Sequence, residues 1–237
     1  MTAVRTASVL ERVEDVRSRL RAAAQRSNRS IDEITLVAVT KTHPPAAVCE
    51  AISAGLRDFG ENRVQEAETK IPTVGRAAAS WHLIGHLQSN KARRAVELFD
   101  VIHSLDSIAL ARRLDRVCAE LERQELPVLI QVQLGHEATK TGVNEAFVPE
   151  LVDAVTSCSR LRLQGLMTLP PFLANAEEVR PYFRRLRQLR DDLKRQGAFD
   201  DQQGELSMGM THDFEIAIEE GATMVRVGTA IFGEREN

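Results

Sequence analysis

The feature that most constrains this chain is a repeated alternation of short apolar runs with longer amphipathic runs through almost all of its 237 residues. Several short runs, such as LVAV and VLIQV, are continuously apolar, which is typical of parallel strands buried on both faces. We predict eight strands, at Thr35–Thr40, Arg57–Gly60, His82–Gly85, Val101–Ser104, Pro127–Gln133, Leu163–Thr168, Leu206–Gly209 and Thr223–Val227.

The longer runs carry apolar residues at steps of three or four, which form one stripe along a helix. Val9, Val13, Val16 and Leu20 make such a stripe in the first run. The predicted helices cover residues 8–25, 45–54, 62–71, 88–97, 107–123, 146–156, 177–195 and 212–220. Eight strands alternating with helices predict a (β/α)8 barrel with an extra N-terminal helix. A doubly wound open sheet would show the same alternation, but no GxGxxG follows the first strand.

Composition excludes several classes of protein. The net charge of −3 gives no basic excess for binding nucleic acid or a membrane surface. No apolar run approaches the roughly 20 residues that span a bilayer, and the N-terminus lacks the apolar core of a signal peptide. Three widely spaced cysteines without a CxxC pair indicate free thiols in a reducing compartment. We therefore expect a cytoplasmic protein, and the absence of a Pro- or Gly-rich linker predicts a single domain over residues 1–237.

In a parallel barrel the functional residues lie where strands end, and Lys41 directly follows the apolar run TLVAVT. Its side chain could extend along apolar surface and place the ammonium in water. It could also be a lysine that its surroundings keep partly neutral, able to attack an aldehyde and form an imine. Position alone favours neither interpretation.

The last predicted strand places Arg226 opposite in direction to Val225 and Val227, so Arg226 would line the barrel. An arginine there needs an acceptor, which could be a buried carboxylate or a ligand. Gly228 and Thr229 follow it, with a close backbone approach and a hydroxyl, as in the phosphate sites of many barrels.

Two more strand ends carry hydrogen-bonding groups. Ser207 and Gly209 precede Thr211 and Asp213 at a predicted helix N-terminus, an arrangement that suits a phosphate or simply caps the helix. Asn62 could equally be a cofactor contact or the cap of the helix that follows it.

His82 and His86 are four residues apart, which invites a zinc interpretation. The residues between them are predicted to be a strand, and the glutamate of an HExxH motif is missing. We therefore expect no metal site, and expect both histidines to be packed and hydrogen-bonded near the barrel mouth.

At these residues the sequence resembles the pyridoxal phosphate homeostasis proteins, which are similar in fold to the N-terminal barrel of alanine racemase. The resemblance covers almost the whole chain after the first helix. The stretches that carry it are LVAVTKT at 36–42, FGENRVQE at 59–66, WHLIGHLQSNK at 81–91, IHSLDS at 102–107, LIQVQLGHEATKTG at 129–142, GLMTLPP at 165–171, LSMGMTHDFEIAI at 206–218 and VRVGTAIFG at 225–233.

The resemblance implies a binding site for pyridoxal 5′-phosphate, a form of vitamin B6. Lys41 matches the lysine that holds the cofactor as a Schiff base. Ser207, Gly228 and Thr229 match positions around its phosphate. Arg226 matches the arginine that faces the pyridine nitrogen, and Asn62 matches a residue lining the pocket. The family more often has serine at positions 40 and 211, where this chain has threonine.

The implied role is intracellular homeostasis and delivery of pyridoxal phosphate, without catalytic residues. An arginine opposite the ring nitrogen disfavours its protonation and weakens the ring as an electron sink.

A small amino-acid racemase is the alternative, but it needs a second base. The one tyrosine, Tyr182, lies in a charged helical run, and the chain ends at Asn237 without length for the second racemase domain. A class I aldolase that uses Lys41 directly is a third interpretation. We expect a monomer that makes transient contacts with apo forms of pyridoxal phosphate enzymes.

Overall fold

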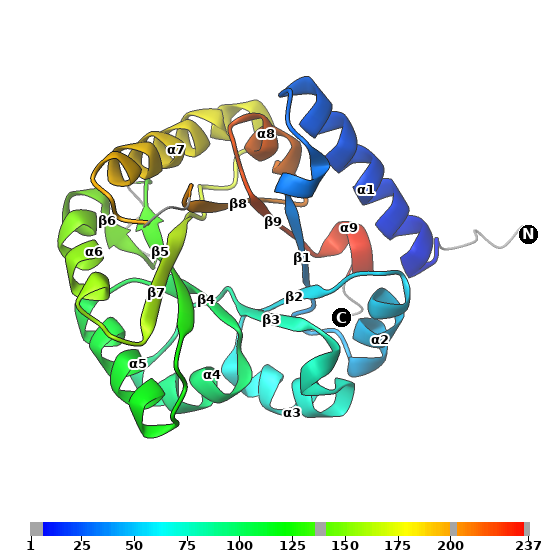
Figure 1. Ribbon diagram of the computed structural model, residues 1–237. Helices are drawn as coiled ribbons and strands as arrows, with labels where there is room; N and C mark the ends of the chain where they lie inside the picture. Colours follow the sequence, from blue (N-terminus) through cyan, green and yellow to red (C-terminus); the bar gives the residue numbers. More distant parts are fainter. Residues whose placement is uncertain (1–6, 136–140, 200–202, 235–237) are drawn as a thin grey trace, which may run out of the picture.

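The computed structural model describes residues 7–135, 141–199 and 203–234. Its centre is a closed ring of eight parallel strands surrounded by helices (Figure 1). The ring strands are β1 Thr35–Val39, β2 Asp58–Glu61, β3 Ser80–Leu83, β4 Val101–Leu105, β5 Leu126–Gln133, β7 Leu161–Met167, β8 Glu205–Met210 and β9 Met224–Val227. They follow one another around the ring in chain order, and the pairing of β4 with β5 and of β1 with β9 closes it. The short strand β6, Val143–Asn144, pairs only with the end of β5.

Helices form the outer layer because one face of each is apolar. They are α1 Val9–Arg26, α2 Pro45–Ser53, α3 Val64–Val74, α4 Ala92–Leu98, α5 Ile108–Glu120, α6 Val148–Thr156, α7 Arg180–Arg195, α8 Phe214–Glu219 and α9 Thr229–Phe232. Helix α1 begins with a capping box. The Ser8 hydroxyl accepts a hydrogen bond from the Glu11 amide, and the Glu11 carboxylate accepts one from the Ser8 amide.

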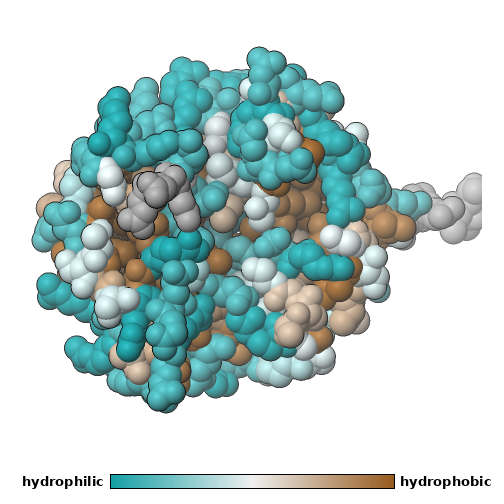
Figure 2. Space-filling model, in the orientation of Figure 1, coloured by the Kyte–Doolittle hydropathy of each residue, from teal (hydrophilic) through white to brown (hydrophobic). Residues whose placement is uncertain are grey.

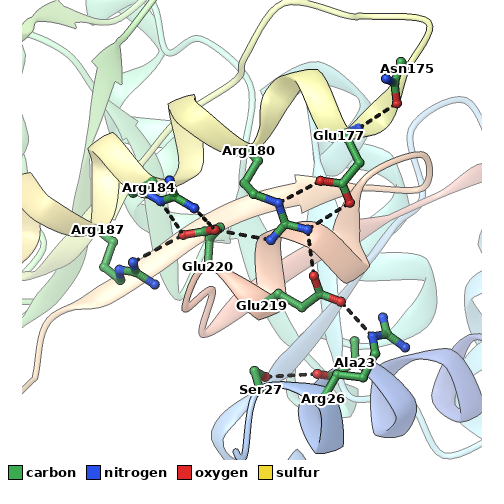
Figure 3. A network of polar contacts seen from close by, with 10 residues as sticks. All are labelled: Ala23, Arg26, Ser27, Asn175, Glu177, Arg180, Arg184, Arg187, Glu219 and Glu220. Carbon is green, nitrogen blue, oxygen red and sulfur yellow. Dashed lines mark hydrogen bonds and ion pairs between the residues drawn. The ribbon is translucent and has the colours of Figure 1, made fainter.

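The N-terminal helix α1 completes the outer layer. The last helix, α9, has only four residues, and α1 lies outside β1 and β9, between α8 and α2 (Figure 1). Arg19 and Arg26 of α1 form ion pairs with Glu215 and Glu219 of α8. Figure 3 shows how Glu219 also joins Arg180 at the start of α7, so that three helices share one network of charges.

The described residues form two apolar regions. The main core lies between the ring and the helices, and a smaller cluster of Val101, Leu129, Met167 and Met224 lies within the ring. Hydrophilic residues dominate the rim in Figure 2, with hydrophobic residues recessed between them. Among the described residues, no helix is both long enough and apolar enough to span a membrane.

The structure confirms the predicted barrel and its extra N-terminal helix. Among the predicted strands the largest shift is in β3, predicted at His82–Gly85 and observed at Ser80–Leu83, and neither β6 nor α9 was predicted. The shift arises because the Trp81 amide is anchored by Asp100, while Gly85 has left the strand to pass the backbone of Asn62. The expected single domain over residues 1–237 stays a prediction.

Candidate functional site

Lys41 lies two residues beyond the end of β1, at the carboxyl-terminal end of the barrel, and is half-buried. The residue before it, Thr40, is fully buried and held at two atoms. Its hydroxyl donates to the Glu61 carboxylate at 2.5 Å, and its carbonyl oxygen accepts from the Lys70 ammonium at 2.7 Å. The backbone that carries Lys41 is therefore fixed from behind.

Glu61 and Lys70 form a buried ion pair at the back of this strand end, with 2.5 Å between Lys70 Nζ and Glu61 Oε1. Burial raises the pKa of Glu61, and the hydrogen bond and charge of Lys70 oppose that rise. The second carboxylate oxygen of Glu61 is buried without a hydrogen-bond partner. This pair joins β2 and α3 to the end of β1.

Arg226 of β9 points into the ring and is almost fully buried. Its Nη1 donates to the Ser207 hydroxyl at 2.6 Å and its Nη2 donates to the Thr168 carbonyl at 2.9 Å. Within the described residues it forms no ion pair with a carboxylate, so its acceptors are neutral. Burial lowers the pKa of Arg226 to about 10, with the Asp213 charge acting in the opposite direction.

Gly228 and Thr229 lie where β9 ends, beside β1. A Cβ at position 228 would lie 3.2 Å from the Val39 carbonyl oxygen, so a side chain there would crowd the backbone of β1. Thr229 is exposed and begins α9. These two residues therefore border the strand end that carries Lys41.

The structure places Ser207 inside the ring, where its hydroxyl accepts from Arg226 and contacts His103 Nδ1 at 2.8 Å. Thr211, half-buried, lies at the actual end of β8. Asp213 is the N-cap residue of α8, but its carboxylate accepts from the Met210 amide at 2.6 Å rather than from the helix. Burial raises the pKa of Asp213, and the Met210 hydrogen bond opposes that rise.

Asn62 lies at the end of β2 and is half-buried. It does not cap α3, because Arg63 occupies the N-cap position. A Cβ on Gly85 would lie 2.1 Å from the Asn62 carbonyl oxygen, so this close approach requires glycine. Asn62 also borders an open pocket of about 550 Å³ between the ends of β2 and β3.

The two histidines that we predicted near the mouth, His82 and His86, lie in different surroundings. His82 is buried and hydrogen-bonded as expected, but it lies inside the ring, with Nδ1 2.9 Å from His103 Nε2. The prediction that His86 is packed was wrong: its side chain is 46% exposed and pairs with Asp106 at 3.2 Å. No group of three His, Cys, Asp or Glu able to hold a metal occurs within the parts of the chain that the structure describes.

The ends of four consecutive ring strands bring the predicted residues together. Asn62 follows β2, Lys41 follows β1, Gly228 and Thr229 follow β9, and Thr211 follows β8. Arg226 lies one layer deeper in the ring. An amine, a buried guanidinium and hydroxyl groups at one mouth suit a small anionic compound with a carbonyl group.

Sequence reasoning missed His103, Thr168 and the Glu61–Lys70 pair as parts of this site. His103 carried a usable signal, because it is a polar residue within a buried strand, the same signal that identified Arg226. Lys70 gave none, since its position in α3 predicts an ordinary surface lysine. Of the matched stretches, residues 136–140 lie outside the described part of the chain.

Comparison with known proteins gives a consistent result. The family model described as "Alanine racemase, N-terminal domain" matches residues 13–236. A protein of Aquifex aeolicus named pyridoxal phosphate homeostasis protein is 42% identical, with 95% of this chain and 98% of the relative covered. The protein of that name in Escherichia coli (strain K12) is 44% identical, with 96% and 97% covered.

Among solved structures, PipY of Synechococcus elongatus PCC7942 with PLP bound is 40% identical, with a TM-score of 0.81 and coverage of 95% of this chain and 100% of PipY. All three relatives are 40–44% identical to this chain over nearly the full length of both chains. The chain therefore belongs to the family of pyridoxal phosphate homeostasis proteins, within the alanine racemase N-terminal domain fold.

Proposed function

We propose that this protein binds pyridoxal 5′-phosphate covalently through Lys41 and acts in intracellular homeostasis and delivery of that cofactor. The observation that carries the proposal is the match to PipY, a relative of 40% identity solved with PLP bound. Lys41 lies at the strand end where such a ligand would meet the barrel, beside Gly228 and Thr229.

The residues at the mouth fit this cofactor. A phosphate needs hydrogen-bond donors, and Thr229 and Thr211 offer hydroxyl groups at neighbouring strand ends. A small residue is required where the backbone of β9 passes β1, and Gly228 supplies it. Arg226 is buried among neutral acceptors, so its unneutralised charge disfavours protonation of a nearby ring nitrogen.

Each residue has one proposed task. Lys41 condenses with the aldehyde group, and one water leaves, so no oxidant or second substrate is required. Thr40, Glu61 and Lys70 hold the backbone that carries Lys41. Gly228 and Thr229 receive the phosphate, Arg226 faces the pyridine nitrogen, and Asn62 lines the pocket. Bound pyridoxal phosphate would supply an electron sink, which the charge of Arg226 weakens.

Ser207, which the resemblance places around the phosphate, is not proposed to contact the phosphate directly. Its hydroxyl is shared between Arg226 and His103 within the ring. We infer that Thr211, four residues further along, takes the direct contact at the end of β8.

A carrier is favoured over a racemase by the position of Tyr182. Racemisation needs bases on both faces of the substrate carbon, and Lys41 serves one face. Tyr182 lies on α7 and packs against the core between the ring and the helices. It is therefore not available at the barrel mouth as a second base.

Borohydride reduction of the purified protein after incubation with pyridoxal phosphate tests the proposal. Peptide mass mapping should place the added pyridoxyl phosphate on Lys41, and Lys41→Ala should abolish it. Lys91→Ala removes another half-buried lysine near the mouth and should leave the modification unchanged. A modification that persists at another residue in Lys41→Ala would overturn the site. An adduct that forms only with a carbonyl substrate, and not with pyridoxal phosphate, would indicate an aldolase.

We further propose that delivery occurs by transient contact with apo-enzymes, from a cytoplasmic monomer. Loaded protein mixed with an apo-enzyme should transfer the cofactor despite an aldehyde scavenger in solution. Separating the two proteins by a dialysis membrane should abolish transfer under the same conditions. Equal transfer across the membrane would show that release into solution suffices.

A further inference from the structure

Five polar side chains from five strands form one continuous chain of hydrogen bonds through the inside of the barrel. Asp58 Oδ1 lies 3.1 Å from His82 Nε2, and His82 Nδ1 lies 2.9 Å from His103 Nε2. His103 Nδ1 lies 2.8 Å from the Ser207 hydroxyl, which accepts from Arg226 at 2.6 Å. Because β4 and β8 are not neighbours in the ring, the contact from His103 to Ser207 crosses the interior.

With neutral imidazoles, one set of hydrogen-bond directions satisfies both ends of this chain. The Ser80 hydroxyl, 3.2 Å from His82 Nε2, is a further contact at the Asp58 end. A guanidinium only donates, so the Ser207 oxygen accepts from Arg226. The single hydroxyl hydrogen of Ser207 then points to His103 Nδ1, which is unprotonated when the neutral ring carries its hydrogen on Nε2. His103 therefore carries its hydrogen on Nε2 and donates to His82 Nδ1. His82 in turn donates from its Nε2 to the carboxylate of Asp58, at the amino-terminal end of the barrel.

Both imidazoles are neutral in this arrangement, which suits the burial of His103. Burial lowers the pKa of His103 well below its ordinary value, and a proton on His82 or the charge of Arg226 lowers it further. The groups that face His103 are Ser207 from β8, His82 from β3 and Arg226 from β9. Asp58, with 32% of its side chain exposed, is the one charged acceptor of the chain.

The orientation of the Arg226 side chain depends on this order of hydrogen bonds, because Arg226 lacks a carboxylate partner in the described structure. Its direction rests on the Thr168 carbonyl and on a lone pair of Ser207. A serine hydroxyl rotates freely unless its hydrogen has an acceptor, and a hydrogen turned toward the guanidinium would repel it. His103 takes that hydrogen and leaves the lone pair facing Arg226.

We propose that His103 is a positioning residue which, through Ser207, aims the Arg226 guanidinium at the ring nitrogen of pyridoxal phosphate, with His82 and Asp58 fixing the tautomer of His103. This inference rests on the proposed function, since Arg226 is there the residue that faces the ring. It gives a role to two buried histidines that do not reach the barrel mouth.

The first test uses the cofactor-free wild-type protein and detects the imidazole tautomers. Long-range ¹H–¹⁵N correlation spectra at neutral pH should show His82 and His103 as neutral rings protonated on Nε2. A His103 ring protonated on Nδ1 would overturn the inference, whatever the cofactor does.

The second test uses Ser207→Ala, His103→Leu and the double variant. Each single variant should weaken pyridoxal phosphate binding about tenfold, because a hydrogen bond to a charged group is lost or misdirected. The double variant should be no weaker than Ser207→Ala, since both act through one chain. The pH midpoint of the bound chromophore's visible absorbance should rise by about one unit, because the positive charge is no longer held at the ring nitrogen.

Met167→Leu is the matched control, because Met167 is fully buried in the ring but belongs to its apolar cluster. It should keep the wild-type midpoint and affinity. If His103→Leu does not fold, Ser207→Ala carries the comparison. Wild-type affinity and midpoint in Ser207→Ala would overturn the inference, whereas a wild-type protein that forms no adduct at Lys41 would overturn the proposed function instead.

Discussion

The Lys70 ammonium lies 2.5 Å from the Glu61 carboxylate, with both groups enclosed behind the strand end that leads to Lys41. Removing one member of a buried pair leaves an uncompensated charge, so Lys70→Met should cost about 3–5 kcal/mol of unfolding free energy at neutral pH. Urea denaturation measures this cost. Arg94→Ala, which breaks an exposed pair with Glu68, should cost less than about 1 kcal/mol.

The cost of Lys70→Met should depend on pH in a defined direction. Without Lys70 the pKa of Glu61 rises further, because the hydrogen bond and the charge of Lys70, two of the three contributions that oppose burial, are lost. A raised carboxyl pKa means that the folded state binds a proton more tightly than the unfolded state. The part of the penalty that comes from the uncompensated Glu61 charge should therefore be full above the raised pKa of Glu61 and vanish below the unfolded value of 4.5. A penalty unchanged between neutral and acidic pH would contradict the buried carboxylate.

His103 should make the wild-type protein less stable in mild acid. Its folded pKa is depressed below the unfolded value of 6.5, so the unfolded state binds the extra proton. Its contribution to stability is full above pH 6.5 and falls by about 1.4 kcal/mol per pH unit below it, until the folded pKa is reached. In His103→Leu the slope of unfolding free energy against pH should correspond to the uptake of about one proton fewer than in the wild-type protein. His212→Gln, at an exposed histidine, should retain the wild-type slope.

Arg180 should be the most costly of the surface arginines in Figure 3 to remove. It donates to Glu177, Glu219 and Glu220, and these bonds connect the start of α7 to α8. Arg180→Ala should cost about 1–2 kcal/mol, with a smaller cost in about 1 M salt. Thermal unfolding at both salt concentrations checks this. The Arg195 side chain is 76% exposed, so Arg195→Ala should cost less than about 0.5 kcal/mol. An equal effect of both variants would contradict stabilisation by the Arg180 network.

Gly85→Ala should disturb the candidate site from the neighbouring strand end. The added Cβ would lie 2.1 Å from the Asn62 carbonyl oxygen, so the loop after β2 must move. We expect a loss of about 1–3 kcal/mol in unfolding free energy and weaker pyridoxal phosphate binding, measured by absorbance titration. Gly135→Ala is the control, because its Cβ would meet the Pro171 ring at an ordinary 3.6 Å. Equal binding by the two variants would separate Asn62 from the site.

The barrel could be predicted because its periodicity is local. Several strands of the ring, such as β1 and β5, are short apolar runs, and the stripe of Val13, Val16 and Leu20 marks α1 before any contact is known. The exact range of β3 could not be predicted, because it depends on Asp100 anchoring Trp81 from another element. Helix α9 was absent from the predicted helices, since four residues are too few for a periodic pattern.

The positions of the candidate site residues were predictable where strand ends alone decide them. Lys41, Asn62, Gly228 and Thr229 lie at such ends, and the structure gathers them at one mouth. The depth of Ser207 was not predictable, because the segment that contains it also contains the true strand end, at Met210. Its partners, His103 and Arg226, come from residues 104 and 19 positions away.

The place of α1 in the outer layer has a consequence for protein synthesis. Arg19 meets Glu215 across 196 residues of sequence, and β1 meets β9 in the same region. At about 5–20 residues per second a ribosome needs roughly 10–40 s to make that interval. Throughout that time the nascent chain carries an amphipathic helix whose neighbours α8 and α9 do not yet exist. Ring closure must therefore be a late folding event, and the first helix must be shielded from aggregation until the last strand emerges.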